Sequence, residues 1–73
     1  MKDEIRKKTR LIVRKNGEYL VGMIIFSTDL RWSTSPYDAW WTRDREKAEA
    51  MARRTGGIVM LFNPVVGKVR VAR

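Results

Sequence analysis

Arginine, lysine and aromatic side chains carry most of the chemistry that this sequence can offer. The 73-residue chain has sixteen Lys and Arg against eight Asp and Glu, which gives a formal net charge of +8 at pH 7. Ten of the sixteen are Arg, whose planar guanidinium forms paired hydrogen bonds with phosphates and carboxylates. Such a charge attracts polyanions, although net charge also keeps small proteins in solution. The composition therefore favours an anionic partner.

The candidate binding residues combine outward-facing cations of the first and last expected strands with a cation and two aromatic rings in a loop. They are Arg10, Arg14, Arg31, Trp32, Tyr37, Lys68 and Arg70. Such cations neutralise phosphates while aromatic rings stack on bases, as in proteins that bind single strands and RNA. The strand cations form one patch only if both strands expose the same side of the sheet. Lys and Arg on outer strands also protect a sheet against aggregation, which is the ordinary alternative.

Catalysis, metal binding and cofactor binding are not expected. The sequence has no Cys and no His, which removes thiol nucleophiles, disulfides and the common zinc sites. Ser33 and Ser35 have no neighbouring base, and the Asp residues match no Mg²⁺-binding loop. Gly56-Gly57 follows a predicted helix, whereas a phosphate-binding loop opens one. We therefore predict a protein that is not an enzyme and has no catalytic residues, no metal and no cofactor.

The segment from Ala39 to Gly57 should position the rest of the chain. Ala39–Trp41 is predicted as the end of a strand, the stretch from about Arg43 to Thr55 as a helix, and Gly56-Gly57 as its stop. Thr42 should supply the oxygen that caps the first helical N–H groups. The inward face of this helix carries mostly small side chains, namely Ala48, Met51, Ala52 and Thr55. We therefore expect the helix to lie close to a sheet, with a Glu49–Arg53 pair outside.

Two predicted hairpins flank this segment. In the first, Thr9–Lys15 and Glu18–Ser27 are strands joined by Asn16-Gly17, a dipeptide that favours tight hairpin turns. The strand Glu18–Ser27 is apolar on both faces, and Gly22 is the expected position of a bulge or of a close backbone approach. In the second hairpin, a turn at residues 63–67 joins the strands at residues 58–62 and 68–73. Val69 and Val71 should point inward in its last strand.

These elements predict an α+β fold, a small antiparallel sheet of four to five strands with one helix packed on one face. Residues 1–8 are expected to form a flexible basic arm and residues 9–73 a single domain. Because one helix covers one face, the other face needs curvature of the sheet, the loop at residues 28–38 or a second copy in a homodimer. The adjacent rings of Trp40 and Trp41 should then lie on opposite faces.

The cellular setting is predicted from what the chain lacks. Its longest apolar run, Tyr19–Phe26, is too short to span a bilayer, and its charged start does not resemble a signal peptide. We therefore expect a cytoplasmic protein without a membrane partner.

Three stretches resemble a group of known proteins. They are the run from Arg31 to Trp40, the Ala-x-x-x-Ala helix ending in Gly56-Gly57, and Leu61–Pro64. Together they are similar to short uncharacterised proteins of bacteriophages and prophages, and the resemblance covers most of the chain. It implies no activity and no site residues. It does imply a setting in which small proteins bind nucleic acid or inhibit a host defence protein, including CRISPR effectors.

The function predicted from the sequence is binding. The leading hypothesis is a small basic protein that binds DNA or RNA through an Arg/Lys surface with an aromatic contribution. The alternative is a protein-interaction module that docks on an acidic protein surface, for example as an inhibitor of a host defence protein, because Trp, Tyr and Arg dominate interface energetics.

Overall fold

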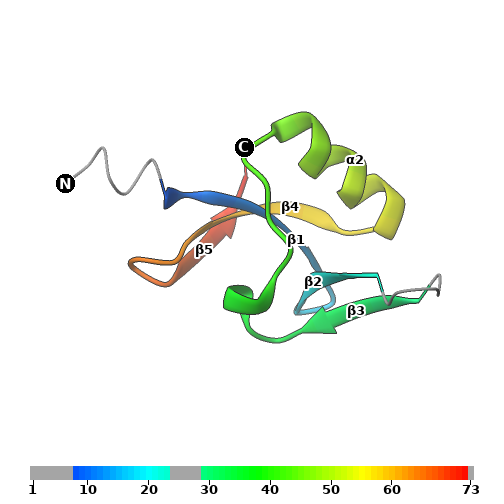
Figure 1. Ribbon diagram of the computed structural model, residues 1–73, viewed down its shortest axis with the longest axis horizontal. Helices are drawn as coiled ribbons and strands as arrows, with labels where there is room; N and C mark the ends of the chain where they lie inside the picture. The colour runs from blue at the N-terminus through cyan, green and yellow to red at the C-terminus, as the bar shows by residue number, and fades with distance from the viewer. Residues whose placement is uncertain (1–7, 24–28, 73) are drawn as a thin grey trace.

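The computed structural model describes residues 8–23 and 29–72, and it shows one sheet with one α-helix (Figure 1). Its elements are β1 (Arg10–Lys15), β2 (Glu18–Met23), β3 (Leu30–Ser33), the short 3₁₀ helix η1 (Pro36–Asp38), α2 (Arg45–Thr55), β4 (Ile58–Asn63) and β5 (Lys68–Val71). The five strands are antiparallel and lie in the order β3-β2-β1-β4-β5. The predicted α+β fold is confirmed.

The β1–β2 hairpin forms where the sequence predicts it. Asn16 and Gly17 take φ angles of 52° and 78°, the left-handed values that a two-residue hairpin turn requires. This turn places Arg14 opposite Tyr19. The pairing of β2 with β3 shifts its register between Leu20 and Gly22, an irregularity at the position where a bulge was expected.

Helix α2 begins two residues later than the sequence suggested. The cap is Asp44, whose Oδ1 accepts hydrogen bonds from the N–H groups of Glu46 (3.0 Å) and Lys47 (3.4 Å). Thr42 was the predicted cap, but its backbone is bridged to Leu11 in β1, with N···O distances of 2.9 and 3.0 Å. Because this bridge holds Thr42 extended, the helix starts only after the chain has left β1. Gly56 ends it in the left-handed conformation, as predicted.

The helix lies close to the sheet because its inward side chains are small. Ala48, Ala52 and Thr55 are buried, as expected. The link from α2 to β4 is equally tight, since a Cβ added at Gly57 would lie 2.7 Å from Cγ1 of Val13. On the exposed side, the expected Glu49–Arg53 pair is replaced by an ion pair of Glu49 with Arg45, at 3.3 Å.

Each face of the sheet carries its own apolar cluster. On the helix side, Val13, Leu20 and Ala52 form a buried cluster, with half-buried neighbours that include Trp32 and Trp40. On the opposite side the buried residues are Ile12, Tyr19, Ala39, Met60 and Phe62, with Val69 packed against them. Figure 1 shows α2 on one side of the sheet and η1 on the other.

The segment that follows β3 supplies the cover of the second face. Ala39 is buried in the cluster there, and the Tyr37 ring meets the Phe62 ring edge-on, with centroids 5.0 Å apart. Side-chain bonds shape this segment, because Oγ of Ser33 donates to Oδ2 of Asp38 at 3.3 Å and Oγ of Ser35 caps η1. Of the three covers expected from the sequence, the folded loop is the one that the structure shows.

The third strand is not where the sequence predicted it. Leu30–Ser33 forms β3, with Trp32 opposite Leu20, whereas Ala39–Trp41 is not a strand. Residues 40–42 instead lie between β1 and β2: the N–H of Trp40 donates to the carbonyl of Leu20 (2.8 Å), and Thr42 pairs with Leu11. The chain thereby crosses from the loop side to the helix side of the sheet. As predicted, Trp40 and Trp41 face opposite sides.

Other predictions need correction or lie outside the described residues. Val71 is 51% exposed, although it was expected to point inward with Val69. The expected arm at residues 1–8, apart from Lys8, the end of the second predicted strand at residues 24–27, and Arg73 lie outside the described residues.

Candidate nucleic-acid interface

Two guanidinium groups stack on one tryptophan ring at the start of β1. The Cζ atom of Arg10 lies 4.5 Å from the ring centroid of Trp41, and the Cζ atom of Arg43 lies 4.9 Å from the same centroid. Both distances fall within the range of cation–π attraction. Trp41 itself is 39% exposed. The two guanidinium groups are therefore held in place at the surface.

Local structure explains why these side chains meet. Arg10 is the first residue of β1 and lies on the face opposite α2, because its neighbour Leu11 shares the helix-side face with Val13. The bonds of Trp40 to β2 and of Thr42 to β1 fix the chain on both sides of Trp41. Arg43 follows directly, before the helix cap. The strand and the crossing segment thus bring Arg10 and Arg43 to one ring.

A hollow of about 430 Å³ lies beside this stack. We call it the Arg–Trp hollow, and it is lined by Lys8, Arg10, Arg43, Pro64 and Val65. None of its described lining residues is acidic. Across the described chain, the ion pair that forms joins Arg45 to Glu49 on the outside of α2. The three cations of the hollow therefore have no carboxylate partner among the described residues.

The arrangement suits an oxyanion. The guanidinium groups of Arg10 and Arg43 lie over the Trp41 ring, and the N–H donors of a guanidinium can form paired bonds with a phosphate. Nε of Arg10 is shielded from water and has no hydrogen-bond partner in the described part of the chain. Lys8 adds a flexible point charge at the rim. Chemically, the hollow can bind phosphate or carboxylate groups.

The candidate residues of the first and last strands do not form one patch. Arg10 stands opposite Phe62 in β4, whereas Arg70 stands opposite Leu61. Because directly opposed residues share a face and successive residues alternate, Arg10 and Arg14 lie on the loop side and Lys68 and Arg70 on the helix side. The first and last strands therefore expose their cations on opposite sides of the sheet, whereas a single patch required the same side.

The remaining candidates are dispersed. Arg14 lies over the Tyr19 ring at 5.9 Å, and Arg31 is exposed on the outer strand β3. Trp32 is half-buried against the helix-side cluster, so it covers the core. Tyr37 is 57% exposed, and its hydroxyl donates to the carbonyl of Pro64 at 3.4 Å, beside the Arg–Trp hollow. Of the seven candidates, Arg10 thus lines this hollow and Tyr37 lies beside it.

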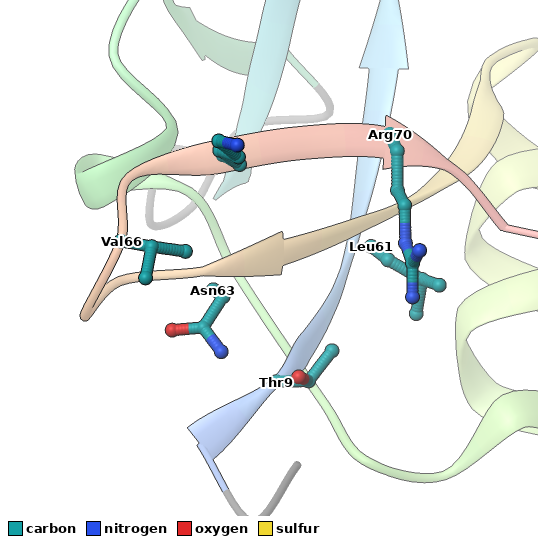
Figure 2. Close-up of a pocket in the computed structure, with 6 residues that line it drawn as sticks. Thr9, Leu61, Asn63, Val66 and Arg70 are labelled. Atoms are coloured by element: carbon teal, nitrogen blue, oxygen red, sulfur yellow. The ribbon is translucent and has the colours of Figure 1, made fainter. Parts of the chain in front are cut away.

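Lys68 and Arg70 line a second hollow of about 230 Å³ on the other face. We call it the helix-side hollow, and it is lined by Thr9, Leu61, Asn63, Val66, Lys68 and Arg70. In Figure 2 the Arg70 side chain extends from β5 over Leu61. The two hollows therefore share no cation: Lys68 and Arg70 of β5 line the helix-side hollow, whereas Lys8, Arg10 and Arg43 line the Arg–Trp hollow.

Sequence reasoning missed Trp41 and Arg43 as site residues, and it placed Lys8 in the basic arm. A signal was present, because residues two apart in an extended segment share a side, which places Trp41 and Arg43 together. Arg43 was instead assigned to the helix. Its meeting with Arg10 also depends on the crossing segment between β1 and β2, and this long-range arrangement is not visible in local periodicity.

Comparison of the chain with protein-family models, with curated proteins and with solved structures gave no match. Within residues 8–23 and 29–72, no group of three or more His, Cys, Asp or Glu side chains could hold a metal ion. No helix in this part of the chain has the length and apolar character needed to cross a membrane. The case for a function therefore depends on the geometry of the surface.

Proposed function

We propose that the protein is a nucleic-acid-binding protein that grips phosphates in the Arg–Trp hollow. The observation that carries this proposal is that Arg10 and Arg43 both lie over the Trp41 ring and line a hollow with no described acidic residue. The contact with the ring restrains both guanidinium groups before a ligand arrives, so less side-chain freedom is lost on binding. The net charge of +8 draws polyanions toward this site.

The binding mode should be largely independent of base sequence. Phosphate contacts position a nucleic acid, whereas contacts with base edges specify sequence. The described cations of the hollow offer phosphate contacts, and the Trp41 ring already carries two guanidinium groups. We therefore expect a protein that binds many sequences with similar affinity.

The experiment that tests this proposal removes the stack and compares it with an equal loss of charge elsewhere. Arg10→Ala with Arg43→Ala should weaken binding to a labelled single-stranded oligonucleotide about tenfold or more at low salt, because charge-assisted bonds are lost. The control is Arg53→Ala with Arg54→Ala, exposed residues of α2 on the other side of the sheet. Fluorescence anisotropy reports the affinity.

The control variant, Arg53→Ala with Arg54→Ala, should lose only the part of the affinity that comes from the general attraction of two positive charges. Equal loss in both variants would contradict the proposal, because net charge alone would then explain binding. Thermal melting of each variant checks that the fold is intact.

A second candidate function is docking on an acidic protein surface. The observation in its favour is a set of aliphatic side chains that are more than half exposed, namely Ile58, Val65, Val66 and Val71. Exposed apolar side chains beside cations are typical of interfaces. This candidate predicts no saturable nucleic-acid binding even at low salt.

A further inference from the structure

The Arg–Trp hollow and the helix-side hollow lie back to back at one end of the sheet. Neighbouring residues of the start of β1 line both: Thr9 belongs to the helix-side hollow and Arg10 to the Arg–Trp hollow. The β4–β5 turn also lines both hollows, since Val66 lines the helix-side hollow and Val65 lines the Arg–Trp hollow. One sheet layer therefore separates two concave basic surfaces.

The helix-side hollow resembles the Arg–Trp hollow in its chemistry. Lys68 and Arg70 are both exposed and lie two residues apart on the same face of β5, about 7 Å along the strand. They flank an aliphatic floor that includes Leu61. The hollow can accept a phosphate at the cations and the body of a sugar or base on the floor.

None of the described residues that line the two hollows is acidic. The sequence contains no Asp or Glu in residues 5–17, which include β1, or in residues 50–73, which include β4, β5 and their turn. At the tip of that turn, Val65 and Val66 are each more than half exposed. The tip of the turn between the hollows is thus exposed and apolar, and a sugar or base can rest on it.

We propose that one single strand of nucleic acid occupies both hollows and passes around the end of the sheet over the β4–β5 turn. This inference rests on the proposed function and assigns its substrate class. A single strand can change direction around one sheet layer, whereas a duplex has a persistence length of about 150 base pairs and stays straight on this scale. A duplex can therefore reach only one of the two hollows.

The test measures binding of the whole protein to an oligothymidylate of about 12 nucleotides, a length within the usual site size of small single-strand-binding domains. A duplex of the same length is measured in parallel. Three double variants are compared with the native chain: Arg10→Ala with Arg43→Ala, Lys68→Ala with Arg70→Ala, and the charge-matched control Arg53→Ala with Arg54→Ala. Analytical ultracentrifugation of the complex gives the stoichiometry.

The inference predicts one strand per protein and a separate role for each hollow. Replacement of Lys68 and Arg70 should weaken single-strand binding about tenfold and make the log–log salt slope shallower by about 1.4, the value for two phosphate contacts. Duplex affinity should change no more than in the control. Melting temperature should stay unchanged, since both side chains are exposed.

Each other outcome overturns a defined part of the account. Replacement of Lys68 and Arg70 could leave single-strand affinity unchanged while replacement of Arg10 and Arg43 lowers it. The inference that one strand occupies both hollows would then be wrong, and the proposed function would stand. Two strands per protein would also overturn the inference, because the hollows would then act independently. Absence of binding by the native chain at low salt would overturn the proposed function and the inference together.

Discussion

At the scale of single residues, the proposed function depends on the geometry of guanidinium groups more than on total charge. A chain with a net charge of +8 attracts polyanions wherever its cations lie. The stack on Trp41 distinguishes Arg10 and Arg43 from the other arginines, because it orients their donors before a ligand binds. Substitutions that keep the charge and change the geometry can therefore test the role of each group.

The first prediction concerns Arg10→Lys combined with Arg43→Lys. Lysine keeps the charge but lacks the planar fork, so affinity for a single-stranded oligonucleotide should fall roughly fivefold at constant salt. Fluorescence anisotropy measures the change, and circular dichroism melting should show little loss of stability. Affinity equal to that of the native chain would mean that positive charge alone suffices.

The second prediction separates Trp32 from Trp41. Trp32 is packed against the helix-side cluster, so Trp32→Ala should lower the free energy of unfolding by about 2–4 kcal/mol. Trp41 is partly exposed beside the two arginines, so Trp41→Ala should lower the free energy of unfolding by only about 1 kcal/mol. It should weaken nucleic-acid binding more strongly than Trp32→Ala does. Urea unfolding and anisotropy measure the two effects. The opposite order would contradict the assignment of Trp32 to the core.

At the scale of elements, the close seam between α2 and the sheet sets the position of everything around it. Ala48 is fully buried in this seam, whereas Ala50 is exposed on the same helix. We predict that Ala48→Leu destabilises the fold by about 1–3 kcal/mol through overpacking, while the matched variant Ala50→Leu is nearly neutral. Chemical denaturation compares them. Equal effects at both positions would show that the helix is not packed as described.

The helix cap gives a second prediction at this scale. Asp44→Ala should destabilise the protein by about 1 kcal/mol, because two N–H groups lose their acceptor. Asp44→Asn keeps an acceptor oxygen and should restore most of the loss. Urea unfolding of the three proteins measures these differences. An unchanged Asp44→Ala variant would contradict the assigned start of α2.

Elements that depend on local signals were predictable from the sequence. The Asn16-Gly17 turn, the inward alanines and the Gly56 end of the helix all follow from the conformational preferences of a few neighbouring residues. The third strand was not predictable in this way. Its place at Leu30–Ser33 depends on pairing with β2, and the bridge of Thr42 to β1 depends on a gap between two strands.

At the scale of the whole molecule, strand register decides which cations can act together. Alternation predicted that Arg10 and Arg70 point outward from their strands; Arg70 is exposed, whereas Arg10 is half-buried over the Trp41 ring. This alternation could not show that they lie on opposite faces, because that follows from the pairing of Arg10 with Phe62 and of Arg70 with Leu61 across β4. The kinds of side chain at the candidate site were therefore predictable from the sequence, but only some of the residues that form it were.

The same register distributes the charge around one end of the sheet. The β4–β5 turn lines both hollows: β4, β5 and Thr9 complete the helix-side hollow, and Lys8, Arg10 and Arg43 complete the Arg–Trp hollow. The loop that covers the second apolar cluster ends beside this surface, where Tyr37 bonds to Pro64. One hydrogen bond thus links this loop to the turn that lines the Arg–Trp hollow.

The most direct test of nucleic-acid binding at the Arg–Trp hollow is the affinity of the native protein for a labelled single-stranded oligonucleotide as a function of salt. Lys8, Arg10 and Arg43 line the hollow, and a single strand releases counterions with a slope of about −0.7 for each phosphate neutralised. We therefore predict micromolar or tighter binding at low salt, with a log–log slope of about −2 or steeper. No saturable binding at low salt, or binding that does not weaken as salt is added, would contradict the proposed function.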